Sequence, residues 1–284
     1  MKLLIFFFLN ISVWGFSQEW ELEEKMMLPE KLSEASGLEF LDSNTLVSIN
    51  DGGHKAKLFV LNLDGSLRKK VTVFEETNRD WESLASDGEY LYIADIGNNK
   101  NTSKNTVVLK VKIADILTKK VVKAKKIYFN YSEQKSFPAE KENFNFDAEA
   151  LVCIGDSLAL FTKNNSTPWT GKSYCYMLSK TPGIYTLKKS SEIEIGPNGW
   201  LIDAITGADY YNGKLYLLTY NRKIQLNFAK NRWVFENEYV FDTYTQKEGI
   251  LIINENEFYI VDEKSTILEG GNLLKYTILN AGEE

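Results

Sequence analysis

The sequence is poor in the residues that most enzyme families use for catalysis. Its 284 residues include one histidine, His54, and no Gly-x-Ser-x-Gly element. These two features exclude a histidine-rich zinc site and argue against a Ser-His-Asp hydrolase. His54 follows two glycines, which is typical of a surface loop, with a role as general base as the alternative. Catalysis and binding are therefore left mainly to carboxylates and amides.

Cysteine is almost as scarce, and the two present, Cys153 and Cys175, do not predict a disulfide. On the strand assignment below, they lie on the first and third strands of one sheet. Such strands are about 9.6 Å apart, whereas a disulfide needs Cα atoms within about 7 Å. We expect two buried free thiols.

Long apolar runs are absent except at the start of the chain. Residues 1–17 combine a basic start, a short apolar stretch and small residues near Ser17, which predicts a signal peptide, with an uncleaved anchor as the alternative. No cysteine follows to carry a lipid, and no later segment is apolar enough to cross a bilayer. We expect an exported protein, in the periplasm, on the cell surface or outside the cell, with 18–284 forming one domain.

Basic charge is also in short supply, since 33 Lys and Arg face 39 Asp and Glu, a net charge of -6. Nucleic acid is therefore an improbable partner, because an acidic protein repels phosphate backbones. Apolar residues make up 44% of the chain and prolines number only 5, so the chain can bury a sizeable core. We expect a monomer that takes a small polar ligand, a carbohydrate or a peptide.

A short pattern recurs five times: an acidic or small residue, any residue, a second polar residue, and then a hydrophobic stretch. The copies occupy 34–38, 80–84, 147–151, 204–208 and 246–250. Their central positions, 36, 82, 149, 206 and 248, are 46, 67, 57 and 42 residues apart. Repeats of this length that contain several strands indicate a propeller or a similar array.

Each copy opens a run of short alternating strands joined by polar turns. The expected strands begin at Ser36 and continue at 45–49, 57–61 and 70–73; then 82–85, 90–94, 106–111 and 121–131; then 149–154, 157–162, 173–178 and 185–195; then 206–210, 214–219, 223–228 and 233–241; and finally 248–253, 257–261 and 273–279. The fifth repeat is one strand short.

Residues 19–28 belong to no repeat and supply the missing strand. A circular array must hide its two free edges, and pairing this strand into the last blade does so. We predict an all-β, five-bladed β-propeller closed in this way. A six-bladed ring is the alternative, but the long interval before Glu149 is explained by a polar loop at 132–144. A pair of β-sandwiches would not explain the recurring acid.

The recurrent pattern predicts a ring of polar side chains where the innermost strands begin. Residues two apart on a strand share a face, so Asp80 pairs with Glu82, and Asp147 with Glu149. The ends of the second strands return to the same end of the sheets and add a second ring. The expected acidic mouth is lined by Ser36, Asp51, Asp80, Asp95, Asn98, Asp147, Lys163, Thr206, Tyr220 and Glu248.

Converging carboxylates are ligands that Ca²⁺ prefers. We expect a divalent cation site built from Glu82, Glu149, Asp95 and Asp51. The alternative is that the acids cap backbone amides or pair with nearby cations, namely Lys163, Arg79 and Arg222. Loop aromatics, Trp169, Trp200 and Tyr220, could also stack on a sugar or a peptide.

Four motifs carry a family resemblance: Asn50-Asp51-Gly52-Gly53, Asp80-Trp81-Glu82, the segment 94–99 (Ala-Asp-Ile-Gly-Asn-Asn) and the segment 147–151 (Asp-Ala-Glu-Ala-Leu). Together they resemble a largely uncharacterised group of secreted bacterial β-propellers. More remotely, the architecture is similar to calcium-dependent propeller lactonases and phytase-like esterases. That likeness implies a metal in the central channel, without implying a reaction.

Three functions are compatible with these features. The first is an exported propeller that binds a polar ligand at the acidic mouth through a divalent cation. The second is a metal-dependent hydrolase of lactones or phosphoesters, with Glu82 or Glu149 as the catalytic base. The third is a scaffold that uses its outer faces to bind a protein partner.

Overall fold

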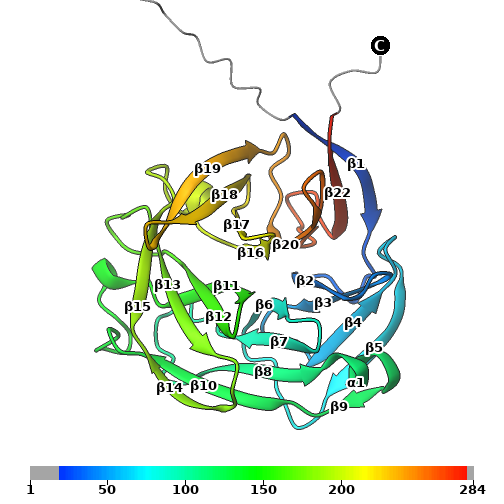
Figure 1. Cartoon of the computed structure of the whole chain (residues 1–284), viewed down its shortest axis with the longest axis horizontal. Helices are drawn as coiled ribbons and strands as arrows, with labels where there is room; N and C mark the ends of the chain where they lie inside the picture. The colour runs from blue at the N-terminus through cyan, green and yellow to red at the C-terminus, as the bar shows by residue number, and fades with distance from the viewer. Residues whose placement is uncertain (1–18, 280–284) are drawn as a thin grey trace, which may run out of the picture.

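The computed structural model describes residues 19–279, which form five β-sheets around a ring (Figure 1). Each sheet is a propeller blade whose strands run from the centre outward. The core strands, blade by blade, are β2 (Ala35–Asp42), β3 (Thr45–Asn50), β4 (Lys57–Leu61) and β5 (Leu67–Val73); β6 (Trp81–Ser86), β7 (Tyr90–Asp95), β8 (Thr106–Lys112) and β10 (Lys125–Tyr131); β11 (Asp147–Ile154), β12 (Ser157–Lys163), β13 (Lys172–Ser179) and β15 (Lys189–Glu194); β16 (Gly207–Tyr211), β17 (Lys214–Leu218), β18 (Arg222–Ala229) and β19 (Arg232–Val240); and β20 (Lys247–Asn254), β21 (Glu257–Asp262), β22 (Asn272–Ile278) and β1 (Trp20–Met27). The prediction of an all-β, five-bladed propeller is confirmed.

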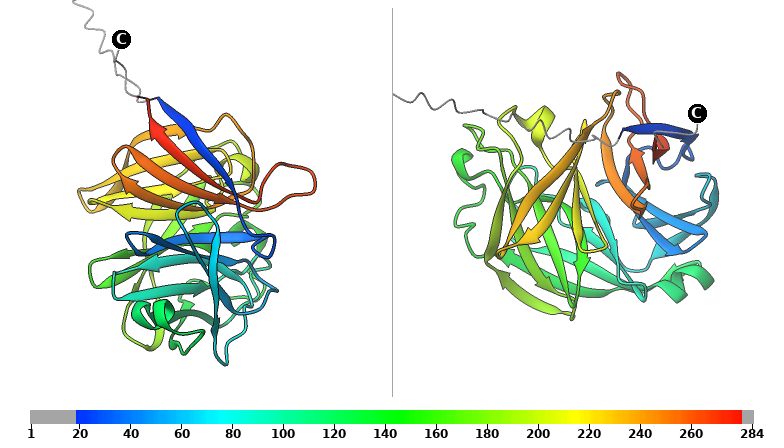
Figure 2. Two further views of the ribbon diagram at one scale, coloured as in Figure 1. Left: turned by 90° about the vertical axis from the view of Figure 1, so that its right-hand side faces the viewer. Right: turned by 45° about the horizontal axis from the view of Figure 1, so that its top comes forward.

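The N-terminal strand closes the ring as the sequence predicts. β1 pairs antiparallel with β22, so the last blade has the order β1-β22-β21-β20 (Figures 1 and 2). The Trp20 ring packs edge-on against Phe258 of β21, with centroids 4.8 Å apart. The beginning and the end of the described chain are thus held in one sheet, and β1 covers the outer edge of β22.

Two expected outer strands are each split between neighbouring blades, which corrects the sequence assignment. The segment 121–131 yields β9 (Val121–Val122), which pairs in parallel with β5 of blade one, and β10, which stays in blade two. The segment 185–195 yields β14 (Gly183–Leu187), parallel to β10 of blade two, and β15 in blade three. Each extra strand covers an outer edge whose backbone groups would otherwise be exposed.

Helical structure is sparse and lies in connections. The helices are α1 (Ile113–Thr118), α2 (Trp200–Asp203) and the 3₁₀ turn η1 (Lys141–Asn143). None of the helices within residues 19–279 is long and apolar enough to cross a membrane. The expected signal peptide, residues 1–17, lies outside the described residues.

The hydrophobic core is divided into five clusters, one between each pair of adjacent blades. Trp81, fully buried, packs between blades one and two, and Ala148 packs between blades two and three. This follows from the alternation of strand side chains, since each blade buries both of its faces. Cys153 and Cys175 are both free thiols, as expected, but only Cys175 is buried, whereas Cys153 is partly exposed.

Polar ties fix the inner strands to one another. The Ser36 hydroxyl donates to the Glu82 carbonyl of the next blade, and the Thr206 hydroxyl donates to the Lys247 carbonyl at 2.6 Å. The innermost strands β2, β6, β11, β16 and β20 contact each other in a closed circle (Figure 1). Their starting ends are thereby held in fixed positions.

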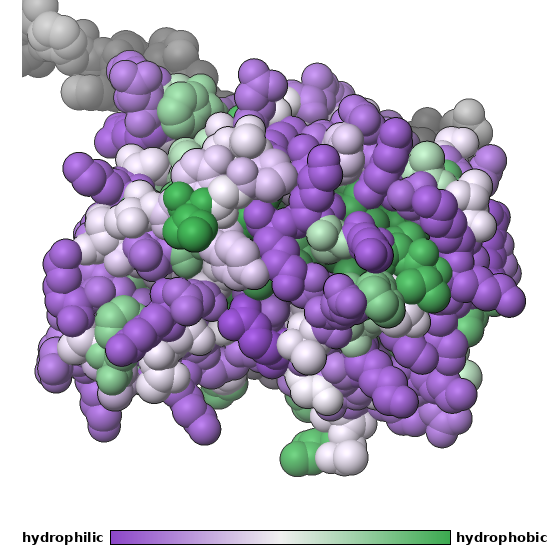
Figure 3. Space-filling view, turned by 90° about the horizontal axis from the view of Figure 1, so that it is seen from below, coloured by the Kyte–Doolittle hydropathy of each residue, from purple (hydrophilic) through white to green (hydrophobic). Residues whose placement is uncertain are grey.

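The outer circumference is mostly hydrophilic on the side seen in Figure 3, where apolar side chains form separate patches. Ile184 and Val121, on the extra strands β14 and β9, are among the exposed apolar residues of the described chain. Scattered apolar residues of this kind are normal for a protein surface. The expectation of a monomer stays a prediction.

Candidate functional site

Three glutamates lie at β-bulges in the inner strands, so their side chains depart from the regular alternation of a strand. The pairing registers of β6, β11 and β20 skip Glu82, Glu149 and Glu248, which oppose no residue on the neighbouring strand. In β2 the skipped residue is Gly37. Because a bulge bends the strand and redirects its side chain, these glutamates are turned toward the end of the ring where the inner strands begin.

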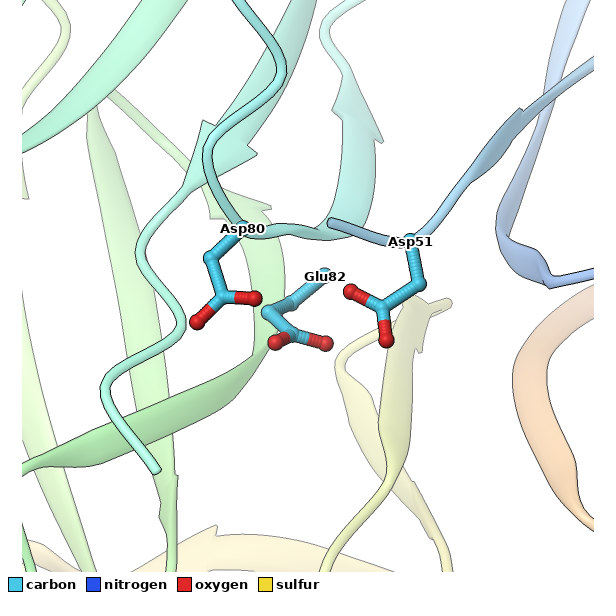
Figure 4. A group of neighbouring side chains, drawn as sticks. All are labelled: Asp51, Asp80 and Glu82. Carbon is cyan, nitrogen blue, oxygen red and sulfur yellow. The ribbon is translucent and has the colours of Figure 1, made fainter. Parts of the chain in front are cut away.

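Three carboxylates meet at this end. Ligand oxygens of Asp51, Asp80 and Glu82 all lie within 4.8 Å of one another. Asp51 follows β3, Asp80 precedes β6, and Glu82 belongs to β6, so two adjacent blades contribute. Figure 4 shows the Glu82 carboxylate between those of Asp51 and Asp80. We call these three residues the carboxylate triad.

Two glycines make room for the triad. A Cβ atom on Gly97 would lie 2.2 Å from Glu82 Oε1 and 2.4 Å from Asp80 Cγ. A Cβ atom on Gly52 would lie 2.5 Å from Asp80 Oδ1. Real Cβ atoms do not approach other atoms so closely, so a larger residue at either position would displace the carboxylates. Gly52 of the Asn50–Gly53 motif and Gly97 of the 94–99 motif therefore have a direct structural role.

Glu82 is the least compensated member of the triad. Its side chain is only 4% exposed, and its Oε1 accepts no hydrogen bond from the described part of the chain. Burial raises the pKa of Glu82 well above its usual range, and the nearby charges of Glu149 and Asp51 raise it further. A buried carboxylate oxygen without a donor needs either a proton or a cation.

Asp80 shares this environment at the more accessible edge. Burial, followed by the charges of Asp51 and Glu149, raises the pKa of Asp80 to about 7. The Asp80 main-chain carbonyl accepts hydrogen bonds from the amides of Ile96 and Gly97. The backbone of Asp80 is thus fixed while its carboxylate points into the triad.

Lys163 of β12 is the local counter-charge. Its ammonium lies 3.3 Å from Glu149 Oε2, and both side chains are nearly fully buried. The Glu149 carboxylate in turn lies close enough to Glu82 for its charge to raise the pKa of Glu82. The positive charge of Lys163 partly offsets the burial that raises the pKa values of Glu149 and Glu248. The single positive charge of Lys163 therefore does not neutralise all the acids around it, which include Glu149 and Glu248.

Asp95, Asn98 and Asp147 support the mouth through hydrogen bonds. Asp95 forms an ion pair with Arg79 at 2.8 Å and accepts from the Asp80 amide at 3.0 Å. The main-chain N–H of Asn98 donates to Asp147 Oδ1 at 2.5 Å, which links blades two and three. Of the four acids that the sequence assigns to the cation, the triad contains Glu82 and Asp51, whereas Asp95 is engaged with Arg79 and Glu149 with Lys163.

Ser36 and Thr206 also lie at this end, where their hydroxyls tie adjacent inner strands together. The Tyr220 hydroxyl lies 3.4 Å from the Lys163 ammonium. Arg222, in contrast, pairs with Asp203 and Glu238 on blade four.

The structure adds residues that sequence reasoning missed. Glu263 is half-buried at the same end, and burial together with the charge of Asp51 raises its pKa to about 8. The polar end of β21 contains both Asp262 and Glu263, and Asp262 accepts hydrogen bonds from Asn272. Asp80 is the third member of the triad, although the sequence pattern predicted it only as a residue lining the mouth.

Comparison with known proteins supports the fold. No protein-family model and no curated protein sequence matches the chain. Among solved structures, it is similar to a Myxococcus xanthus glutaminyl cyclase, with a TM-score of 0.55 and 12% identity over 92% of this chain and 97% of that one. It is also similar to a glucose dehydrogenase, with a TM-score of 0.50 and 11% identity over 93% of this chain and 100% of that one. At such low identities, these similarities show the β-propeller fold alone.

Proposed function

We propose that this protein binds a divalent cation, Ca²⁺, at Asp51, Asp80 and Glu82, and binds a polar ligand through that ion. The supporting observation is Glu82 Oε1, a buried carboxylate oxygen that accepts no hydrogen bond from residues 19–279 and lies beside two further carboxylates. A cluster of acids alone would not support the proposal, because exposed acids often gather without an ion. A buried oxygen aimed into the cluster does support it.

The chemistry of the triad suits Ca²⁺. This ion takes six to eight oxygen ligands at about 2.3–2.6 Å in flexible geometry. Three carboxylates from two blades supply the charge and leave positions for water and for ligand oxygens. Binding would also offset the burial and the repulsion that together raise the pKa of Asp80 and Glu82, since the ion replaces the protons.

Thermal unfolding in calcium and in EDTA tests this proposal. We expect CaCl₂ to raise the Tm of the wild-type protein and EDTA to reverse this rise. At a free calcium concentration about 100 times the Kd, the ion should add about 2.7 kcal/mol to the free energy of unfolding. Glu82→Gln keeps the side-chain size and removes the charge, so it should abolish the calcium-dependent rise.

The matched control is Glu39→Gln. Glu39, in β2, is also a carboxyl whose pKa is raised by burial and by the charge of Asp209, but it lies outside the triad. Its calcium-dependent rise should equal that of the wild type. A wild-type Tm that does not respond to millimolar calcium would refute the proposal.

A second candidate function is hydrolysis of a lactone or a phosphoester. The observation in its favour is the position of Glu149, which lies close enough to Glu82 of the triad to raise its pKa and is paired with Lys163. In this function the ion would polarise the substrate, while Glu149 takes a proton from the attacking water. Glu149→Gln should then abolish turnover of model lactones and phosphoesters while the calcium-dependent Tm rise persists. Absence of turnover in the wild-type protein would refute this function and leave calcium binding standing.

A further inference from the structure

Three aromatic side chains, Trp200, Tyr220 and Tyr244, lie beside the acidic mouth, and we call them the aromatic wall. The rings of Trp200 and Tyr220 meet edge to face with centroids 5.8 Å apart, and Tyr220 meets Tyr244 in the same way at 6.2 Å. Trp200 is 38% exposed and Tyr244 is 40% exposed, whereas Tyr220 is buried behind them. Large aromatic surfaces left open next to a polar site are a common feature of ligand-binding proteins.

The wall is held rigidly although its outer rings are exposed. Asp203 closes the short helix α2 that begins at Trp200, and its buried carboxylate accepts a hydrogen bond from the Asn198 amide at 2.5 Å and pairs with Arg222. The Tyr244 hydroxyl donates to the Leu201 carbonyl at 2.9 Å, which joins the two exposed sides of the wall. The rings are therefore positioned before any ligand arrives, which lowers the entropic cost of binding.

A single ammonium group links the wall to the carboxylate triad. Lys163 Nζ lies 5.5 Å from the ring centroids of both Trp200 and Tyr220. The same ammonium contacts Glu149, whose charge acts on Glu82. The wall and the triad are thus neighbours of the same Lys163–Glu149 ion pair.

The charges on the two sides restrict the chemistry of that ligand. Lys163 beside the wall disfavours a cationic group there. At the mouth, the three carboxylates of the triad together with Glu149, Glu248 and Glu263 formally outnumber the positive charges of one Ca²⁺ ion and Lys163, which disfavours an anionic group. A neutral group remains, with a flat apolar face for the tryptophan and several oxygens for the ion. Sugar rings have both features, since their axial C–H groups form an apolar face and their hydroxyls surround it.

We propose that Trp200 and Tyr244 form a saccharide subsite. One sugar of a neutral oligosaccharide packs its apolar face on Trp200, and hydroxyls of the neighbouring sugar complete the coordination of the cation at the triad. This inference rests on the proposed cation site, and it names the ligand class of that site. Trp169, the other loop tryptophan predicted to stack on a ligand, donates its indole N–H to the Gly196 carbonyl and has a structural role instead.

Isothermal titration with maltose, cellobiose and lactose in saturating calcium tests the proposal. We expect the wild-type protein to bind at least one of these disaccharides, and EDTA to abolish the binding. Trp200→Ala should weaken that binding about tenfold or more and leave the calcium-dependent Tm rise intact. Trp233→Ala is the matched control, because Trp233 packs against Phe228 on the outer part of blade four. It should bind the sugar as the wild type does.

The possible results distinguish a failure of the saccharide subsite from a failure of the cation site. A protein that responds to calcium but binds none of the three sugars, or a Trp200→Ala variant that binds them as the wild type does, would overturn the saccharide subsite and leave the cation site standing. Sugar binding that persists in EDTA would overturn the coordination of the sugar by the ion. Tighter binding of glucosamine or of galacturonic acid than of neutral sugars would overturn the neutral ligand class.

Discussion

Gly97 gives the carboxylates of Asp80 and Glu82 the space they share. Its position allows both side chains to approach the backbone more closely than any Cβ would permit. Its φ angle is not left-handed, so the requirement for glycine comes from space alone. The acidic mouth therefore depends on a residue that carries no functional group.

Gly97→Ala should disrupt the triad. The added Cβ would lie 2.2 Å from Glu82 Oε1, so the carboxylates must move apart. We expect the loss of the calcium-dependent Tm rise and a drop in the free energy of unfolding of about 1–3 kcal/mol, a typical cost of overpacking. Gly183→Ala is the control, since its nearest neighbour is the flexible Tyr185 side chain. A Gly97→Ala variant that still responds to calcium would show that the triad tolerates the displacement.

The sequence could place the acids but could not show which of them remain available. The repeat pattern put Asp80, Glu82, Asp147 and Glu149 at one end of the ring. It could not show that Arg79 pairs with Asp95, because that contact depends on the course of the chain around β7. Nor could it show the bulges, since a single skipped residue leaves the hydrophobic alternation almost unchanged.

Strand β1 closes the ring around an unusual buried lysine. Lys223 of β18 is 2% exposed, and its Nζ lies 3.7 Å from the Trp20 ring centroid and 4.5 Å from that of Phe258. It forms no ion pair within the described residues. Burial lowers its pKa from 10.5 to about 7, against the attraction of the charged form to the ring faces.

Lys223→Met should therefore stabilise the protein in a pH-dependent way. Between pH 7 and 10.5 the unfolded chain binds a proton at Lys223 that the folded chain does not, so wild-type stability falls as the pH drops through this window. Relative to the wild type, the variant should gain about 1–3 kcal/mol at pH 6, and the gain should shrink toward pH 10. Urea unfolding at both pH values measures this, with Lys55→Met in an exposed loop as control. Equal stabilities at pH 6 would show that the aromatic rings fully compensate for burial.

The element pattern was predictable wherever hydrophobic alternation decides it. The four core strands of each blade and the N-terminal closure follow from strand spacing and from one unpaired segment. The crossings of β9 and β14 into neighbouring blades were not predictable. Their local sequences also fit the outer edge of their own blade, and only the three-dimensional position of the neighbouring edge decides between the two.

At the scale of the whole molecule, stability depends on a closed circle of blade contacts. Each hydrophobic cluster lies between two blades, and the one between blades five and one includes residues on both sides of the closure. Opening the ring at β1 removes Trp20 from the cluster between blades four and five and exposes the outer backbone of β22.

A chain that begins after Met27 should show this dependence. We expect a lower Tm and a tendency to aggregate, since the unpaired edge of β22 can pair with another molecule. A peptide of residues 18–28 added in trans should restore the Tm, whereas the same peptide with Trp20→Ala should do so poorly. A truncated chain as stable as the full one would show that the ring does not need this closure.

A crystal structure of the protein, from crystals grown with calcium, will show whether the carboxylate triad holds a cation. We predict one calcium peak in the anomalous difference map, with oxygens of Asp51, Asp80 and Glu82 about 2.3–2.6 Å from it, and no such peak in crystals of Glu82→Gln. Density that shows Glu82 Oε1 bonded to a protein donor or to water, with no ion at the triad in saturating calcium, would contradict the account.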